Sequence, residues 1–256
     1  MCQLFGMSSR QPASVQFSLE GFVRRGGDTD HHADGWGIAF FEDRGCKVFM
    51  DELPSVVSPV AEKICRDPIK SRHVIAHVRK ATHGPVALAN CHPFTRELWG
   101  RQWAFAHNGK LDAFHPALQG NYTPLGETDS ELAFCLILQN LREHFGCVAP
   151  SLAALHEKLQ SLSAKITESG PFNYLLSEGE HLFAYCTTAL SSVQRQAPFG
   201  RVQLVDCEAE IDLSHHNQLD DCMTLIATQP LTHNENWEQF TPGELRLFAS
   251  GQQVPL

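Results

Sequence analysis

The residue with the clearest capacity for chemistry is Cys2, which directly follows Met1. Because a cysteine side chain is small, we expect Met1 to be removed, which would leave Cys2 with both a thiol and a free α-amine. Their reference pKa values, about 8.5 and about 7.7–8.0, are close enough that proton transfer between them costs little free energy. A nucleophile that carries its own general base needs no histidine partner. The alternative is that Cys2 only begins a buried first strand and has no chemical role.

Arg79 is the second candidate, and it stands at the end of a strand-like stretch. Its planar guanidinium carries five donors, which suit bidentate capture of a carboxylate. Thr82 and His83 follow on a loop that Gly84-Pro85 tightens, where a hydroxyl and a backbone amide could add further donors. An exposed arginine followed by an ordinary turn is the competing interpretation.

Asn108 and Gly109 follow another apolar stretch. An Asn-Gly pair in this position predicts a two-residue β-hairpin turn, because both residues tolerate positive φ. Such a turn would also direct the asparagine amide and the glycine N–H outward. Two donors so placed can stabilise an oxyanion, and loss of one such donor typically raises the barrier by about 2.7–4 kcal/mol.

Asp129 is the fourth candidate and follows Thr128 at the start of a predicted helix. Thr128 and Glu131 have the spacing of a capping box, in which each side chain binds the backbone N–H of the other residue. A carboxylate in the first helical turn is favoured by the helix dipole, and this alone would explain Asp129. The functional alternative is that Asp129 faces the ammonium group of a ligand.

The histidines and glycines do not indicate a metal or nucleotide site. The adjacent histidine pairs at 31–32 and 215–216 lack the spacing of zinc ligands. His73 and His77 are four residues apart, but a strand would hold them too far apart to share an ion. The chain has no Gly-x-Gly-x-x-Gly or Gly-Lys-Ser/Thr motif. We therefore expect no metal and no other cofactor.

The elements that must position these residues follow from the residue pattern. Segments rich in β-branched and aromatic residues are predicted as strands: 3–7, 37–41, 73–78, 102–106, 172–176, 181–187, 223–228 and 244–249. Apolar periodicity and capping signals predict helices: 15–25, 58–65, 128–145 and 150–167. The strands cluster early and late, which favours a layered α+β fold with antiparallel sheets and helices packed outside.

Composition excludes several function classes. The chain has 256 residues, of which 43% are hydrophobic and 19% charged, as in an ordinary globular domain. Its formal net charge is −9 and no basic run exceeds a pair, which argues against nucleic acid or a membrane as partner. The longest hydrophobic run, 132–138, is far shorter than the roughly 20 residues that span a bilayer. Nine scattered cysteines and the lack of a secretory signal predict a reduced, cytoplasmic protein.

The candidates gain specificity from their order along the chain. After Cys2 come Arg-x-Ala-Thr-His-Gly at 79–84, Asn-x-His-Pro at 90–93, His-Asn-Gly at 107–109 and Thr-Asp-Ser-Glu at 128–131. This series resembles the glutaminase domain of class II glutamine amidotransferases, and longer stretches resemble its single-domain YafJ-type bacterial members. The resemblance implies an N-terminal-nucleophile hydrolase fold, a four-layer αββα sandwich of two antiparallel sheets flanked by helices. It covers residues 1–256 as a single glutaminase domain with no synthase domain.

The resemblance also implies catalytic roles. Cys2 matches the family's nucleophile, and Asn108 and Gly109 match its oxyanion hole. The implied reaction is hydrolysis of the γ-glutamyl amide bond of glutamine, or of another γ-glutamyl compound, through a thioester on the N-terminal cysteine.

Substrate contacts are implied in the same way. Arg79, supported by Thr82 and His83, matches the clamp on the α-carboxylate of glutamine, and Asp129 matches the partner of the α-ammonium. Lys80 stands where some synthases with this motif have a tryptophan that helps to enclose the substrate.

Three functions are compatible with this resemblance. The favoured one is a freestanding hydrolase of a γ-glutamyl amide or peptide, with a small-molecule substrate. The second is a glutaminase subunit that supplies ammonia to a separate acceptor protein. The third is a catalytically silent domain that binds γ-glutamyl ligands or a protein partner, and it is disfavoured because every position that the chemistry needs is present.

Overall fold

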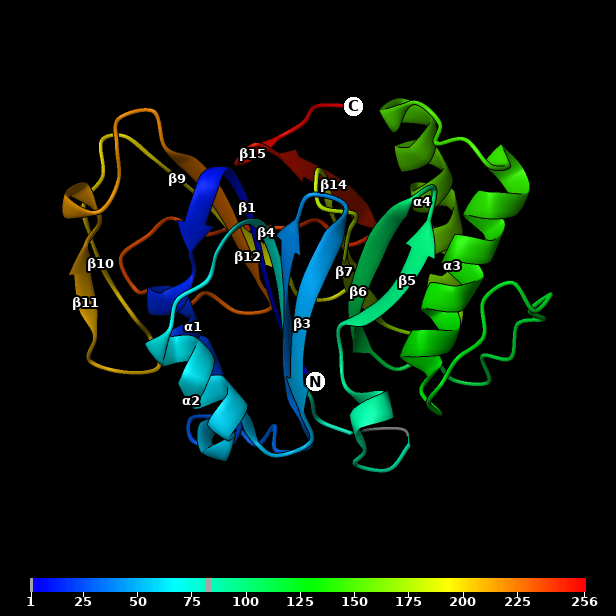
Figure 1. The fold of residues 1–256 in the computed structure, drawn as a ribbon, viewed down its shortest axis with the longest axis horizontal. Coiled ribbons are helices and arrows are strands. Elements are labelled where there is room, and N and C mark those ends of the chain that lie inside the picture. Colours follow the sequence, from blue (N-terminus) through cyan, green and yellow to red (C-terminus); the bar gives the residue numbers. More distant parts are fainter. Residues whose placement is uncertain (1, 82–83) are drawn as a thin grey trace.

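Two antiparallel β-sheets face each other in the centre of the molecule, and helices cover the outer side of each sheet (Figure 1). The structure is a computed structural model that describes residues 2–81 and 84–256. One outer layer consists of α1 (Gln16–Arg24) and α2 (Pro59–Arg66), and the other of α3 (Asp129–Phe145) and α4 (Leu152–Thr167). The predicted α+β class and four-layer αββα arrangement are therefore confirmed.

The first sheet has seven strands with the beginning of the chain at its centre. Their order is β13 (Glu238–Gln239), β9 (Ser191–Gln196), β12 (Cys222–Ala227), β1 (Gln3–Ser14), β4 (Lys70–Val78), β2 (Trp36–Glu42) and β3 (Gly45–Asp51). β1 pairs antiparallel with β4 on one side and with β12 on the other. Strands from early and late parts of the chain thus hold the first strand on both sides.

The second sheet has six strands and faces the first. Their order is β15 (Gln252–Gln253), β14 (Glu244–Ala249), β8 (Leu182–Cys186), β7 (Phe172–Ser177), β6 (Arg101–Gly109) and β5 (Phe94–Leu98). A separate two-stranded ribbon consists of β10 (Arg201–Gln203) and β11 (Glu210–Asp212). All the strand pairs are antiparallel, as the clustering of strands in the sequence predicted.

Three of the helices begin at a side chain that accepts a hydrogen bond from the first turn. The hydroxyl of Thr128 accepts from the N–H of Glu131 at 3.2 Å, and Ser58 and Ser151 cap α2 and α4 in the same way. These caps satisfy amides that have no partner inside the helix. The predicted capping box is half formed, because the Glu131 carboxylate accepts from the N–H of Gly126. None of the helices in the described parts of the chain is long and apolar enough to cross a lipid bilayer.

Hydrophobic side chains fill the spaces between the layers, and β6 shows how one strand serves two of them. Because successive side chains of a strand point to opposite faces, Ala104 and Ala106 face the other sheet, whereas Trp103 and Phe105 face the helices. The ring of Phe105 stacks on that of Phe134 in α3 at a centroid distance of 5.2 Å. Burial of such apolar surface, at about 25 cal/mol per Å², is the main force that holds the layers together.

All the predicted strands and helices are present, with ends that differ by at most three residues except in β1, which extends seven residues beyond its predicted end. The prediction missed β3 and β5, which lie at sheet edges, and β9 with its short edge partner β13. It also missed β15 and the β10–β11 ribbon. These strands are short, polar or partly exposed, so their residues carry little of the alternating apolar pattern that identifies a strand.

The predicted hairpin turn at Asn108-Gly109 is wrong. Both residues belong to β6 and pair with Asn173 and Phe172 of β7, a strand that lies much later in the chain. The preference of an Asn-Gly pair for a turn is local and small, so pairing with a neighbouring strand in a buried sheet outweighs it.

Candidate active site

Cys2 lies at the beginning of β1, where the strand meets the end of β4. The register pairs Gln3 with Val78, which brings Cys2 next to the main chain that follows β4. The thiol accepts a hydrogen bond from the N–H of Lys80 at 3.2 Å and lies 3.3 Å from the carbonyl oxygen of the same residue. The main chain of Lys80, just after the end of β4, thus fixes the sulfur of the partly buried Cys2.

The charges around Cys2 act on its thiol in opposite directions. Burial raises the pKa of the Cys2 thiol above its ordinary value, whereas the hydrogen bond from Lys80 and the positive charge of Arg79 lower it. The negative charge of Asp129 adds to the increase. At neutral pH the thiol therefore needs a base close by before it can act as a thiolate nucleophile.

Arg79 is buried and not exposed, which contradicts the competing interpretation of an ordinary surface arginine. Its side chain is only 3% exposed. The guanidinium donates to the carbonyl oxygens of Asp34 at 3.2 Å, Pro85 at 3.3 Å and Gly84 at 3.4 Å. Its positive charge is thus held between two loops and close enough to Cys2 to affect the thiol.

The glycine-rich segment before β2 lies against the residues that follow β4. Gly35 accepts a hydrogen bond from the N–H of Arg79 at 2.8 Å, and the carboxylate of Asp34 accepts from the N–H of Ala81 at 2.8 Å. This pairing extends the contact between β2 and β4 past the ends of both strands. Thr82 and His83, which the sequence also predicts as substrate contacts, lie outside the described residues.

Asn108 and Gly109 end β6, on the second sheet. Asn108 is fully buried, and its amide Nδ2 donates to the hydroxyl of Thr228 at 3.4 Å. Its Oδ1 is also buried and has no hydrogen-bond partner among the described residues. A Cβ on Gly109 would lie 1.8 Å from the carbonyl oxygen of Pro171, so only glycine fits there without displacement of the backbone.

Asp129 is the first residue of α3 and ties that helix to the segment after β6. Its Oδ2 accepts from the N–H of Leu111 at 2.7 Å, and its Oδ1 accepts from the N–H of Ser130 at 2.9 Å. The carboxylate is partly exposed. Its negative charge raises the pKa of Cys2 and opposes the burial that lowers the pKa of His107.

Strand alternation brings Cys2 and Asn108 to the same space between the sheets. Leu4 packs between the sheets, and Cys2, two residues earlier on the same strand, has the same facing. Ala106 packs there from the other sheet, and Asn108 follows it by two residues. Cys2 and Asn108 therefore converge from distant segments of the chain on one end of the sandwich.

Three buried polar residues at this end carried no signal that could have selected them from the sequence. Thr228 and Asn173 hydrogen-bond to Asn108, and Asn90 joins two loops by contacts with Pro85 at 3.0 Å and Glu127 at 2.9 Å. Asn90 falls in Asn-x-His-Pro and Thr228 in Ile-Ala-Thr-Gln-Pro-Leu-Thr, two stretches that carry the family resemblance, but neither stretch specifies the contacts of its side chain.

Three buried histidines lie behind these residues. The rings of His77 and His92 are 4.1 Å apart, and His107 lies 2.8 Å from the hydroxyl of Ser130 through Nδ1 and 3.3 Å from the carbonyl of Pro171 through Nε2. Burial lowers the pKa of all three, and that of His77 falls to about 3. They are therefore neutral at physiological pH and join the sheets and α3 as polar but uncharged groups.

Among the described residues, Glu178, Glu180 and His181 lie close enough together to share a metal ion. They occupy the turn between β7 and β8. This turn follows the last residue of β7, whereas Gly109 pairs with the first residue of that strand. The hydrogen bond to Glu178, at 2.5 Å, raises the pKa of His181, and Arg101 pairs with Glu180 at 2.5 Å. His181 and Arg101 therefore already contact these carboxylates, and the group lies at the opposite end of the sandwich from Cys2.

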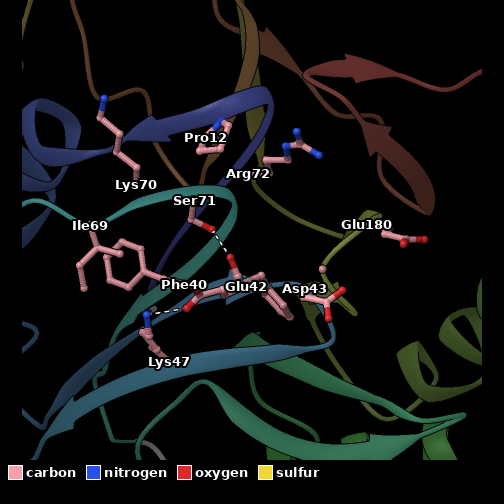
Figure 2. Close-up of a pocket in the computed structure, with 12 residues that line it drawn as sticks. Pro12, Phe40, Glu42, Asp43, Lys47, Ile69, Lys70, Ser71, Arg72 and Glu180 are labelled. Atoms are coloured by element: carbon pink, nitrogen blue, oxygen red, sulfur yellow. Dashed lines mark hydrogen bonds and ion pairs between the residues drawn. The ribbon is translucent and has the colours of Figure 1, made fainter.

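A cavity of about 410 Å³ opens at this same far end (Figure 2). It is lined by the β2–β3 hairpin, the start of β4 and the β7–β8 turn. Half of its twelve lining residues are exposed and charged, such as Lys47, which points toward Glu42 in Figure 2. Because the start of β4 pairs with Ser14 and its end with Gln3, the cavity and Cys2 lie at opposite ends of the sheet.

Comparisons with known proteins identify the family of this chain. A family model described as class II glutamine amidotransferases matches residues 1–256. The chain belongs to this family. It is 48% identical over 254 residues to Escherichia coli YafJ, named as a candidate glutamine amidotransferase, and the match covers 99% of this chain and all of YafJ.

Solved structures show the same fold. The crystal structure of a predicted glutamine amidotransferase from Pseudomonas aeruginosa PA01 has a TM-score of 0.78, 41% sequence identity and full coverage of both chains. The glutamine phosphoribosylpyrophosphate amidotransferase of B. subtilis has a TM-score of 0.52 and 16% identity, and the match covers 99% of this chain and 48% of that one. The second likeness shows the shared fold alone.

The contact at Gly109 leads to a prediction for Gly109→Ala. The added methyl group must displace the Pro171 carbonyl, so we expect the free energy of unfolding to fall by about 3 kcal/mol. Gly45→Ala is the matched control, because its Cβ would meet no atom nearer than 3.6 Å. Urea denaturation of both variants checks this, and equal stability for the two would contradict the close approach.

The buried histidines predict a specific dependence of stability on pH. Since His77 has a pKa of about 3 when folded and about 6.5 when unfolded, the unfolded chain binds a proton that the folded chain excludes. The stability that neutral His77 contributes is present above pH 6.5 and decreases as the pH falls toward 3. At pH 5 we expect a loss on the order of 2 kcal/mol.

The test compares the His77→Asn variant, whose stability should fall less between pH 7 and pH 5, with His216→Asn. His216 is exposed, so that control should keep the slope of the unmodified protein. Parallel slopes for all three proteins in urea titrations would show that His77 is not the group responsible.

Proposed function

We propose that this protein hydrolyses the γ-glutamyl amide bond of glutamine or of a related γ-glutamyl compound, through a thioester on Cys2. The observation that carries the proposal is the position of the Cys2 thiol, held by Lys80 between the charges of Arg79 and Asp129. Membership of the class II glutamine amidotransferases supports hydrolysis of a glutamine amide in general. The match of the family model to residues 1–256 supports a single glutaminase domain.

The first step requires a base for the thiol, whose pKa is raised by burial. While Met1 is attached, the nitrogen of Cys2 is an amide and cannot accept a proton. Removal of Met1 converts it into an amine with an ordinary pKa of about 7.7–8.0, which matches that of a thiol closely enough to take its proton. The cysteine then serves as nucleophile and carries its own general base.

The bond changes follow from this arrangement. The Cys2 thiolate attacks the γ-carbonyl carbon, and the oxygen that becomes negative is stabilised by the Nδ2–H of Asn108 and the N–H of Gly109. The protonated α-amine returns its proton to the departing nitrogen, so that ammonia or an amine leaves and a γ-glutamyl thioester remains. A water molecule then hydrolyses the thioester, which releases glutamate and restores the thiol.

Recognition of the substrate relies on its two charged ends. Arg79 binds the α-carboxylate, supported by Thr82 and His83, and Asp129 binds the α-ammonium. Hydrogen bonds to charged groups contribute about 1.5–3 kcal/mol each, so amides that lack either end bind much more weakly. Arg79 suits this role because it is buried, since a charge removed from water interacts more strongly with an incoming carboxylate.

Two other outcomes remain open to the same site. Ammonia released from glutamine can pass to a separate acceptor protein, in which case hydrolysis would be slow until that protein is added. A catalytically silent domain would bind γ-glutamyl ligands and release no glutamate at all. Glutamate release from a panel of γ-glutamyl amides and peptides, with and without cell extract, distinguishes these outcomes.

The role of the nucleophile is tested with a diazoketone analogue of glutamine. We expect covalent addition at Cys2, seen by peptide mass spectrometry, and loss of all glutamate release in Cys2→Ala. Cys147→Ala should retain both activities, because Cys147 is an exposed thiol that takes no part in the site. Labelling at another cysteine, or turnover by Cys2→Ala, would overturn the assignment.

The carboxylate clamp is tested with Arg79→Lys. An ammonium group keeps the charge but cannot reproduce a bidentate contact, so KM should rise about tenfold or more. The substrate series includes an analogue without the α-carboxylate, for which the variant and the unmodified enzyme should differ little. An unchanged KM for glutamine would refute the role of Arg79.

A further inference from the structure

We infer that Thr228 and Asn173 are positioning residues that aim the two oxyanion donors, Asn108 Nδ2–H and Gly109 N–H, at the reacting carbonyl. The inference rests on the proposed function, because it concerns how the oxyanion formed in that reaction is held. Both residues are buried, at 5% and 0% exposure. Each one binds a different part of Asn108.

Thr228 holds the side chain of Asn108. Its hydroxyl oxygen accepts from Asn108 Nδ2 at 3.4 Å and from the N–H of Leu4 at 2.9 Å, while its own N–H donates to the carbonyl of Leu4 at 3.1 Å. Both lone pairs of the hydroxyl are then used, and the nitrogen end of the Asn108 amide faces Thr228. Among the described residues Nδ2 has no other acceptor, so its second hydrogen is available for a ligand.

The same hydroxyl also connects the strand of the Cys2 nucleophile to the oxyanion donor Asn108. Leu4 lies two residues after Cys2 on β1, so Thr228 fixes the strand of the nucleophile and the amide of Asn108 to one oxygen atom. A movement of Asn108 away from Cys2 would break a hydrogen bond to a buried group, which costs about 1–3 kcal/mol. Thr228 therefore determines the distance between nucleophile and donor as well as the orientation of the amide.

Asn173 holds the main chain of Asn108. Its Nδ2 donates to the carbonyl oxygen of Asn108 at 2.8 Å and to the hydroxyl of Thr188 at 2.8 Å. Its Oδ1 accepts from the N–H groups of Thr187 and Thr188, both at 2.9 Å. An amide with both of its ends engaged in this way has no freedom to rotate, so its contact with Asn108 is rigid.

The contact at the carbonyl also fixes the second donor. The carbonyl of Asn108 and the N–H of Gly109 belong to one planar trans peptide group, in which they point in opposite directions. When Asn173 sets the direction of the carbonyl, it therefore sets the direction of the Gly109 N–H as well. The close approach of the Pro171 carbonyl to Gly109 limits the same segment from the other side.

The state of Asn108 argues that this arrangement serves more than folding. Its Oδ1 is buried without a hydrogen-bond partner among the described residues, and its Nδ2 makes one long contact at 3.4 Å. An unsatisfied buried acceptor destabilises the folded state, so a side chain selected only for stability would not be an asparagine in this environment. The orientation of the amide depends on Thr228 because little else holds it.

The test compares Thr228→Val with Thr228→Ser. Valine matches the shape of threonine but accepts no hydrogen bond, so we expect kcat for glutamate release to fall by about 10–100-fold while KM changes by less than about threefold. Serine retains the hydroxyl and should restore kcat to within about threefold. Alkylation of Cys2 by iodoacetamide forms no oxyanion, so its rate should be the same in all three proteins.

Asn173→Asp provides a second, independent variant. The carboxylate can still accept from the N–H groups of Thr187 and Thr188, but it cannot donate to the carbonyl of Asn108. We expect a similar loss of kcat with little change in the alkylation rate. Asn140→Asp is the matched control, because Asn140 also donates to a main-chain carbonyl, that of Leu136, but in the middle of α3.

Each outcome decides the inference. Full kcat in a folded Thr228→Val variant would overturn the role of Thr228, and so would an equal loss in Thr228→Ser. If Thr228→Val does not fold, as judged by its melting temperature, the Asn173→Asp variant decides alone, and full kcat there overturns the inference. An unmodified enzyme that is inert toward every γ-glutamyl donor would refute the proposed function, and this inference with it.

Discussion

The antiparallel pairing of β1 with β4 is the interaction on which the candidate site depends. It places the Cys2 thiol against the main chain of Lys80 and beside Arg79. A shift of one residue in this register would turn every side chain of β1 to the opposite face. Leu4 packs between the sheets and Phe5 packs under the helices. Such a shift would move Leu4 to the helix side and Phe5 to the space between the sheets, where neither fits the core. The hydrophobic core thus determines where the sulfur points.

Polar contacts between distant segments complete the arrangement. Thr228, at the end of β12, joins the first strand to the second sheet, and Asn90 joins the loop after Arg79 to the loop before Asp129. Several buried polar atoms without described partners, on Asn108, His77 and His92, lie at this same end. Such groups reduce stability, so their concentration at one place is typical of a region shaped for function.

Sequence patterns predicted the fold class and the main strands and helices, because β-branched runs, apolar periodicity and capping residues are local signals. Cys2, Arg79 and Asp129 could be named as candidates from residue type and position, but only their order along the chain with the other motifs made them specific. Asn108 and Gly109 were singled out as a pair, but their assignment to a hairpin turn was wrong, because the strand that pairs with them is far away in the chain. Thr228 and Asn173 could not be found, since their importance lies in contacts that exist only in the folded protein.

The central claim is that the α-amine of Cys2, once exposed, acts as the base for its own thiol. The most direct measurement compares the protein with Met1 removed to the same protein in which Met1 is retained by inhibition of the methionine aminopeptidase during expression. Both forms are checked by intact mass and assayed for glutamate release across γ-glutamyl donors. The account predicts that only the trimmed form releases glutamate, whereas equal rates from the two forms would contradict it.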